Sequence, residues 1–260
     1  MFDWALFLLI IAVCLPGVLI VVPRTLRTAL KRLPADRRPP PTPLLIAISA
    51  LQSLVFIAAA SAAGTGLAQR AGLAAPFFQA LASGGAVWNA LQPQLLLALI
   101  AGVSGGLVFT AAYYLFFRPR LDAQTVSSME GLRMGLGIWG RVLYGGIAEE
   151  VITRWGLMTF IVWLGVLIAG SANAAVVWTA IVISGVLFGL GHLPNYIAAG
   201  CRRTPMFIAL TISLNLLASL ISGWLFWQYG LLAAMLAHAL FHIVWWPFDR
   251  HFYQLESEPE

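Results

Sequence analysis

Long apolar stretches alternate with short polar connections along most of the chain. Because a membrane-spanning helix needs about 20 mostly apolar residues, each stretch of that length predicts one span. The second half of the chain is broken at Gly170-Ser171-Ala172-Asn173 and at Gln228-Tyr229-Gly230, where glycine and short polar residues favour turns. The pattern therefore predicts an all-α, polytopic membrane helix bundle with about seven transmembrane helices. The predicted spans are about 4–23, 44–68, 93–117, 142–168, 173–191, 206–227 and 231–248.

The composition agrees with a membrane protein. The chain is 60% hydrophobic and 10% charged, with a mean hydropathy of +0.88, whereas a soluble domain is about 45–50% apolar and roughly 25% charged. We expect one membrane-embedded domain over residues 1–260. The first apolar run is longer than a signal-peptide core and lacks a basic start, so it is expected to be a retained span. The two cysteines, Cys14 and Cys201, predict neither a disulfide framework nor a thiolate metal site.

The basic residues indicate an orientation. The connection 24–43 holds six Lys and Arg, 118–141 holds four, 192–205 holds two and the tail holds Arg250, whereas the other side holds only Arg70. By the positive-inside rule, this bias places the N-terminus outside and the C-terminus in the cytoplasm. The net charge of +5 is thus a topology signal and does not indicate a nucleic-acid partner. Fourteen of the fifteen basic residues are Arg, which is typical of a GC-rich genome and favours a bacterial inner membrane.

Two further features concern helix placement. Residues 121–140 are expected to form an amphipathic helix on the inner membrane surface, where Arg133 and Trp139 would suit the interface. Small-residue spacings at Gly102/Gly106 and Gly185/Gly189 predict close contacts between helices.

Ionisable residues inside the predicted spans are few and clustered. No Asp, Glu, Lys or Arg occurs from Trp155 to Cys201 or from Thr204 to Phe248. Because such groups are costly in a bilayer, those that occur there tend to be functional or paired. The predicted topology brings three polar fragments to the inner half of the membrane, on three helices, which favours one shared cavity. The fragments are Glu149-Glu150-Val151-Ile152-Thr153-Arg154, Phe188-Gly189-Leu190-Gly191-His192 and His238-Ala239-Leu240-Phe241-His242.

The paired glutamates have different predicted surroundings. Glu150 and Arg154 are four residues apart, in the order that favours an ion pair on one helix face. A buried pair costs desolvation, so we interpret it as a structural clasp. Glu149 lies about 100° around the helix from Glu150, so it can face another cavity and act as a general base. The alternative is that both glutamates are structural partners.

The aromatic and histidine residues permit several interpretations. His192 follows Phe188 by one helical turn among glycines. Taken alone, this pattern is also typical of an interfacial histidine and a core phenylalanine. His238 and His242 share one helix face, a spacing that suits two metal ligands, two hydrogen-bond donors or a small structural network.

Together these residues resemble the CPBP family, the CAAX proteases and bacteriocin-processing enzymes, of which the Ras-converting CAAX endopeptidase is the best-known type. The family pattern is Glu-Glu-x-x-x-Arg, then Phe-x-x-x-His, then His-x-x-x-Asn or Asp, on different membrane helices. Order and spacing agree over a core at about 140–250. The chain departs from the pattern at His242, which stands where the family has Asn or Asp, and at Thr153 and Trp155 around the arginine. The matching positions are Glu149, Glu150, Arg154, Phe188, His192 and His238.

The resemblance implies peptide hydrolysis in the membrane by a glutamate-activated water, with neither cofactor nor metal. Glu149 would be the general base and His192 would help to hold the water. His238 and His242 would face the developing oxyanion, and Glu150 with Arg154 would fix the helix. The implied substrate is a membrane-anchored peptide or protein. In a bacterium, a leader or another membrane anchor is more expected than a prenylated tail.

Two alternatives remain open at this point. Three histidines and a glutamate could form a zinc site, although the sequence lacks a His-Glu-x-x-His motif. The protein could also be a non-catalytic membrane scaffold or immunity protein, or carry a proton relay, although no internal repeat indicates a transporter.

Overall fold

The fold is a bundle of membrane-length helices. The structure, a computed structural model, describes residues 2–30 and 39–257. Within these ranges it contains helices and no strand, and seven helical runs are long and apolar enough to cross a membrane. The predicted all-α bundle of about seven spans is therefore confirmed. The elements are α1 (Trp4–Leu30), α2 (Thr42–Leu67), α3 (Pro76–Ser83), α4 (Val87–Ala111), η1 (Ala112–Phe117), η2 (Arg118–Arg120), α5 (Ala123–Gly140), η3 (Arg141–Ala148), η4 (Val151–Met158), α6 (Thr159–Ala169), α7 (Ala174–Ala198), α8 (Pro205–Tyr229) and α9 (Leu231–Ser257).

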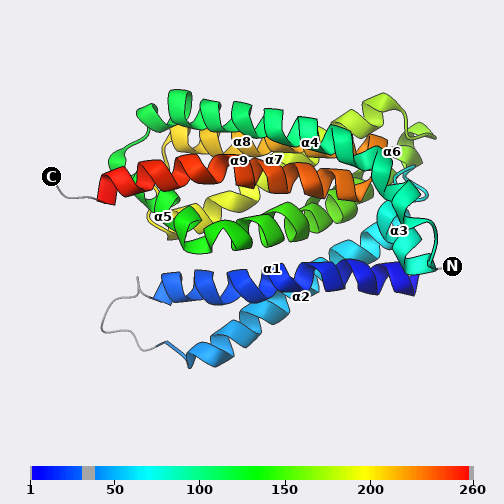
Figure 1. The fold of residues 1–260 in the computed structure, drawn as a ribbon, viewed down its shortest axis with the longest axis horizontal. Coiled ribbons are helices and arrows are strands. Elements are labelled where there is room, and N and C mark those ends of the chain that lie inside the picture. Colours follow the sequence, from blue (N-terminus) through cyan, green and yellow to red (C-terminus); the bar gives the residue numbers. More distant parts are fainter. Residues whose placement is uncertain (1, 31–38, 258–260) are drawn as a thin grey trace.

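The two ends of the bundle carry different connections. Figure 1 shows the N-terminus and α3 at one end and the C-terminus at the other, as an odd number of spans requires. The end of α1, the α4–α5 connection and the α7–α8 connection lie at the C-terminal end. The described Arg-rich connections therefore share one end of the molecule. Lys31, Arg32, Arg37 and Arg38 lie outside the described residues.

Small residues bring two helix pairs into close contact, as their spacing predicted. A Cβ at Gly102 of α4 would lie 2.9 Å from the Cα of Ala237 on α9. A Cβ at Gly189 of α7 would lie 2.9 Å from the Cα of Ile212 on α8. These separations leave no room for larger side chains, so α4 packs directly on α9 and α7 on α8.

The fourth span is longer than predicted. A continuous helical run extends from Ala123 to Ala169, whereas the sequence pattern placed its start near residue 142. Gly137 interrupts the run with a φ of +66° and a ψ of 169°, a conformation that favours glycine. The carbonyl of Leu136, at this break, accepts a hydrogen bond from the Arg24 guanidinium of α1. Thus the polar group exposed by the kink is satisfied by a neighbouring helix.

Two π-helical segments flank the paired glutamates. η3 ends at Ala148 and η4 begins at Val151, so Glu149 and Glu150 lie at the junction between them. π-helical turns are rare and occur frequently at functional sites.

Two expectations about charged residues were wrong. Arg133 does not lie at the membrane surface, because only 4% of it is exposed and its guanidinium is ion-paired with Asp249. Trp139 is 63% exposed and does face outward. The last helix does not end near Phe248: α9 continues to Ser257, and Asp249 is fully buried. The burial of ion-paired groups, which hydropathy cannot report, explains both differences.

Candidate active site

A cavity of about 1080 Å³ lies among the membrane helices and brings the predicted fragments together. Its walls come from α1, α2, α4, η1, α5, η3, η4, α7, α8 and α9. Five of the predicted residues line it, whereas Glu150 and Arg154 lie behind the wall and are buried. The lining residues among the predicted set are Glu149, Phe188, His192, His238 and His242.

Glu149 and His192 face each other across the cavity. The Oε1 atom of Glu149 lies 3.9 Å from the Nε2 atom of His192. Their side chains are 22% and 27% exposed, respectively, so both are accessible from the cavity. A separation of 3.9 Å is too long for a direct hydrogen bond and is compatible with one bridging water.

Phe188 connects the histidines through its backbone and its ring. Its carbonyl oxygen lies 2.8 Å from Nδ1 of His192, one helical turn later. Because a carbonyl can only accept, Nδ1 of His192 carries the proton, and Nε2 of the neutral ring is an acceptor that faces Glu149. The Phe188 ring also lies against the rings of His192 and His238, at centroid distances of 4.6 and 6.3 Å.

Glu150 joins two elements behind the cavity wall. Its Oε2 atom is ion-paired with Nε of Arg154 at 3.2 Å, and its Oε1 atom lies 2.6 Å from Nδ1 of His238 on α9. All three groups are buried. Arg154 also donates a hydrogen bond to the hydroxyl of Thr153, which donates to the backbone carbonyl of Glu149. The predicted Glu150–Arg154 ion pair is therefore present, and it extends to a histidine of another helix.

His242 stacks on His238 and has no hydrogen-bond partner within the part of the chain that the structure describes. The two ring centroids are 4.9 Å apart, with 26° between the ring planes. Both ring nitrogens of His242 are buried and lack a hydrogen-bond partner. The ring lies against η3 at Gly145, where a Cβ would come within 2.4 Å of Nε2. The absence of a side chain at Gly145 thus makes room for the histidine.

The histidines and glutamates do not converge as metal ligands would. Within residues 2–30 and 39–257, no three His, Cys, Asp or Glu side chains are close enough to hold a metal ion together. This geometry gives the zinc alternative no support.

Several polar residues that line the cavity were not among those predicted from the sequence. Asn195, one turn after His192, and Asn215 of α8 line the cavity. Ser49, Gln52 and Ser53 line it from α2, at the i, i+3 and i+4 spacing of one helix face. That spacing was visible in the sequence, but nothing in it indicated which helix α2 faces.

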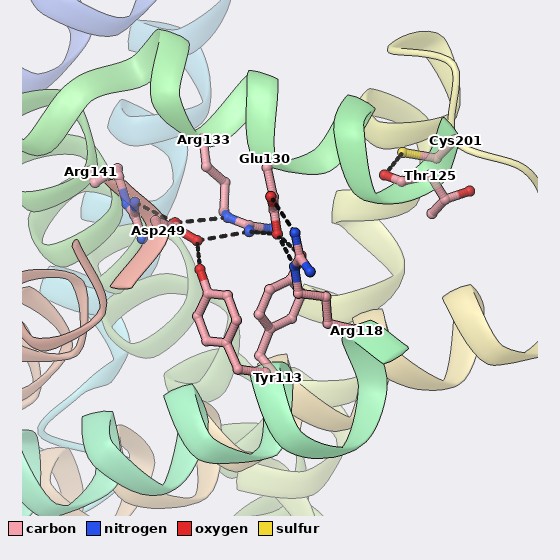
Figure 2. A network of polar contacts seen from close by, with 9 residues as sticks. Tyr113, Arg118, Thr125, Glu130, Arg133, Arg141, Cys201 and Asp249 are labelled. Carbon is pink, nitrogen blue, oxygen red and sulfur yellow. Dashed lines mark hydrogen bonds and ion pairs between the residues drawn. The ribbon is translucent and has the colours of Figure 1, made fainter. Parts of the chain in front are cut away.

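A cluster of buried ions was also missed at the C-terminal end of the bundle. Figure 2 shows Asp249 of α9 beside Arg133 and Arg141, with Glu130 and Arg118 next to them. Its sequence signal was weak, because Asp249 follows the predicted last span and no helical spacing links it to Arg133 or Arg141.

Comparison with known proteins gave one match. Residues 133–244 match the family model described as Rce1-like, type II CAAX prenyl endopeptidase Rce1-like. The matched region contains all seven predicted site residues and begins at Arg133. No match was found among curated proteins or among solved structures.

Proposed function

We propose that this chain is a CAAX-type intramembrane endopeptidase in which Glu149 activates the attacking water. The family match over residues 133–244 supports its assignment to the CPBP/CAAX proteases. The observation that carries this proposal is the cavity in which Glu149 faces His192 at 3.9 Å while Arg154 is occupied by Glu150. Glu149 is accessible, and within the described residues its carboxylate is ion-paired with no arginine or lysine; its neighbour is His192.

The first step is removal of a proton from water. A water between Glu149 and His192 would donate one hydrogen to each, because Nε2 of His192 is an acceptor when Nδ1 is bonded to Phe188. Its oxygen lone pair would then be free to attack a scissile carbonyl carbon. The proton passes to Glu149 as the carbon–oxygen bond forms, and Glu149 returns it to the leaving amine when the carbon–nitrogen bond breaks.

The developing oxyanion needs hydrogen-bond donors. His242 has two unbonded ring nitrogens, one of which carries a proton in the neutral ring, so it can donate without breaking an existing bond. His238 donates from Nδ1 to Glu150, so only its protonated form could offer Nε2–H as a second donor. Loss of one such donor costs roughly 3–4 kcal/mol of transition-state stabilisation in other enzymes. We therefore assign His242 the role that Asn or Asp has in the family pattern.

The proposed substrate is a peptide or protein held in the membrane by an anchor. The cavity, at about 1080 Å³, is slightly larger than the range of roughly 300–1000 Å³ for small-ligand pockets. Side-chain amides and hydroxyls of α2, α7 and α8 line it and could bind the main chain of an extended segment. Such polar groups within a mainly apolar lining suit a membrane-anchored peptide, whose main chain needs hydrogen-bond partners, better than a lipid chain.

The experiment is a cleavage assay of the purified protein in lipid vesicles. Two quenched fluorescent peptides serve as probes, a prenylated C-a-a-X peptide and an unprenylated peptide with an acyl anchor. Glu149→Gln should lower kcat by about 10²- to 10⁴-fold, as expected for loss of a general base, without changing the melting temperature. Glu149→Asp, which keeps the carboxylate on a shorter side chain, should retain partial activity.

Three outcomes would overturn this proposal. Full activity of Glu149→Gln would exclude it as the base. Inhibition by a chelator that added zinc reverses would replace the glutamate mechanism by a metal-dependent one. A scaffold would be favoured by two results together: the purified wild-type protein cleaves neither probe, and deletion of the protein leaves the membrane proteome of the cells unchanged.

A further inference from the structure

Within the described residues, polar contacts at two levels join the helical run Ala123–Ala169, which carries the glutamates, to α9, which carries His238 and His242. The first is the Glu150–His238 contact, at 2.6 Å. The second lies at the C-terminal end of the bundle, where Nη1 of Arg141 donates to Oδ2 of Asp249 at 2.7 Å. Figure 2 shows this second contact within its cluster. Neither contact involves a group that faces the proposed water.

Asp249 accepts hydrogen bonds from three different elements. Arg133 of α5 donates to both carboxylate oxygens, at 2.9 and 2.8 Å, and the hydroxyl of Tyr114 donates at 2.6 Å. With Arg141, these bonds use the acceptor capacity of a carboxylate, which is about four lone-pair sites. Asp249 is fully buried, and Arg133 and Arg141 are only 4% and 3% exposed. These bonds tie the C-terminal part of α9 to α5, η1 and η3.

The two contacts bracket His242. On an α-helix, residues seven apart lie on nearly the same face, so Asp249 lies two turns beyond His242 on its face of α9. His238 lies one turn before it. On the other helix, Arg141 precedes Glu149 by two turns. Because His242 has no hydrogen-bond partner among the described residues, its position toward Glu149 depends on packing and on these flanking contacts.

We propose that Asp249 is a positioning residue that holds His242 against η3 and thereby aligns it with Glu149. The catalytic consequence of this inference rests on the proposed function. The structural part, that Asp249 fixes the position of His242, does not depend on it. Asp249 lies five residues beyond the end of the family match, so the contact is not part of the matched pattern. We expect Asp249 to favour one arrangement of the helices over others, because a buried ionic cluster seldom adds net stability but can select one helix arrangement.

The test is the chemical accessibility of His242. Diethyl pyrocarbonate acylates exposed imidazole nitrogens, and mass spectrometry of peptides gives the rate at each histidine, with the exposed His251 as reference. Both His242 nitrogens are buried, so its reaction in the wild-type protein should be slow. Asp249→Asn should accelerate it about tenfold by freeing the end of α9. Asp249→Glu, which keeps the charge on a longer side chain, should fold and give an intermediate rate.

Glu130→Gln is the matched control. Glu130 is a buried carboxylate of the same cluster, bonded to Arg118 and Tyr113 and ion-paired with Arg133 at 3.7 Å. Within the described residues, however, it makes no hydrogen bond or ion pair with α9 or η3. Glu130→Gln should reduce the free energy of unfolding about as much as Asp249→Asn does. Its His242 should nevertheless be acylated at a rate within about twofold of that in the wild-type protein. An unchanged His242 rate in both Asp249 variants, or an equal acceleration in Glu130→Gln, would overturn the proposal.

Cleavage kinetics test the catalytic consequence separately. In the vesicle assay, Asp249→Glu should lower kcat about tenfold or more with KM nearly unchanged, since a misplaced oxyanion donor affects the transition state alone. A rise in KM at constant kcat would contradict the positioning role. If the wild-type protein cleaves no probe, the proposed function fails while the accessibility result still decides the role of Asp249.

Discussion

At the scale of single residues, Glu149 and Glu150 are adjacent but have opposite environments. Glu149 is accessible from the cavity, whereas Glu150 is fully buried between Arg154 and His238. The angular offset of consecutive helical residues produces this division, because two neighbours cannot face the same side. One carboxylate is thus available for chemistry, and the other holds the histidine of a second helix.

This division predicts different costs for the two amide substitutions. Glu150→Gln should reduce the free energy of unfolding by about 3–5 kcal/mol, since it leaves the buried Arg154 without its counter-charge. Glu149→Gln should change it by less than about 1 kcal/mol, because Glu149 is partly exposed and not ion-paired with an arginine. Thermal unfolding in detergent, followed by circular dichroism, measures both. Equal melting temperatures would contradict the structural role of Glu150.

At the scale of elements, the site depends on close approach of η3 and α9. The contact is possible because Gly145 faces the His242 ring and Gly146 faces Ala239, where a Cβ would lie 2.8 Å from the Cα. π-helical geometry on both sides of the glutamates adds to this local departure from a regular helix.

Gly145→Ala should therefore impair both stability and cleavage. The new methyl group would lie 2.4 Å from Nε2 of His242 and push the ring away. We expect a loss of about 1–3 kcal/mol, which is typical of overpacking, together with a lower kcat. Gly131→Ala in α5 is the control, because nothing lies within 4 Å of its Cβ position. It should be neutral or slightly stabilising, and an equal loss in the two variants would exclude the steric explanation.

At the scale of the whole molecule, the described basic connections gather at the end that holds the C-terminus (Figure 1). However, Arg118, Arg133 and Arg141 in the region 118–141 are bound in internal ion pairs. These three arginines therefore contribute to packing inside the bundle, in addition to any effect they have on membrane orientation. We propose that this end faces the cytoplasm, as the positive-inside rule indicates.

Cysteine labelling of intact cells tests this orientation. In a variant with Cys14 and Cys201 replaced, a membrane-impermeant maleimide should label Ser83→Cys, at the exposed end of α3, without permeabilisation. It should label Arg203→Cys, on the exposed α7–α8 connection, only after the cells are permeabilised. The reverse pattern would place the basic end outside.

Several features could be predicted from the sequence because they depend on local order. The number of spans follows from the length of apolar runs, and the Glu150–Arg154 pair follows from helical periodicity. The grouping of Glu149, His192, His238 and His242 followed from depth alone, since alternating spans place residues of similar depth in one layer. These features need no knowledge of which helices are neighbours.

What remained undecided in the sequence depends on which helix faces which. Hydropathy treats Arg133, Arg141 and Asp249 as surface charges, but the packing of α5, η3 and α9 pairs them in the interior. Packing alone likewise decides three further features. They are the contact of His238 with Glu150, the lack of a hydrogen-bond partner for His242 within the described residues, and the orientation of the polar face of α2 toward the cavity. The physical reason is that lateral contacts between membrane helices are set by shape and by pairing of side chains distant in sequence, which periodicity along one helix does not record.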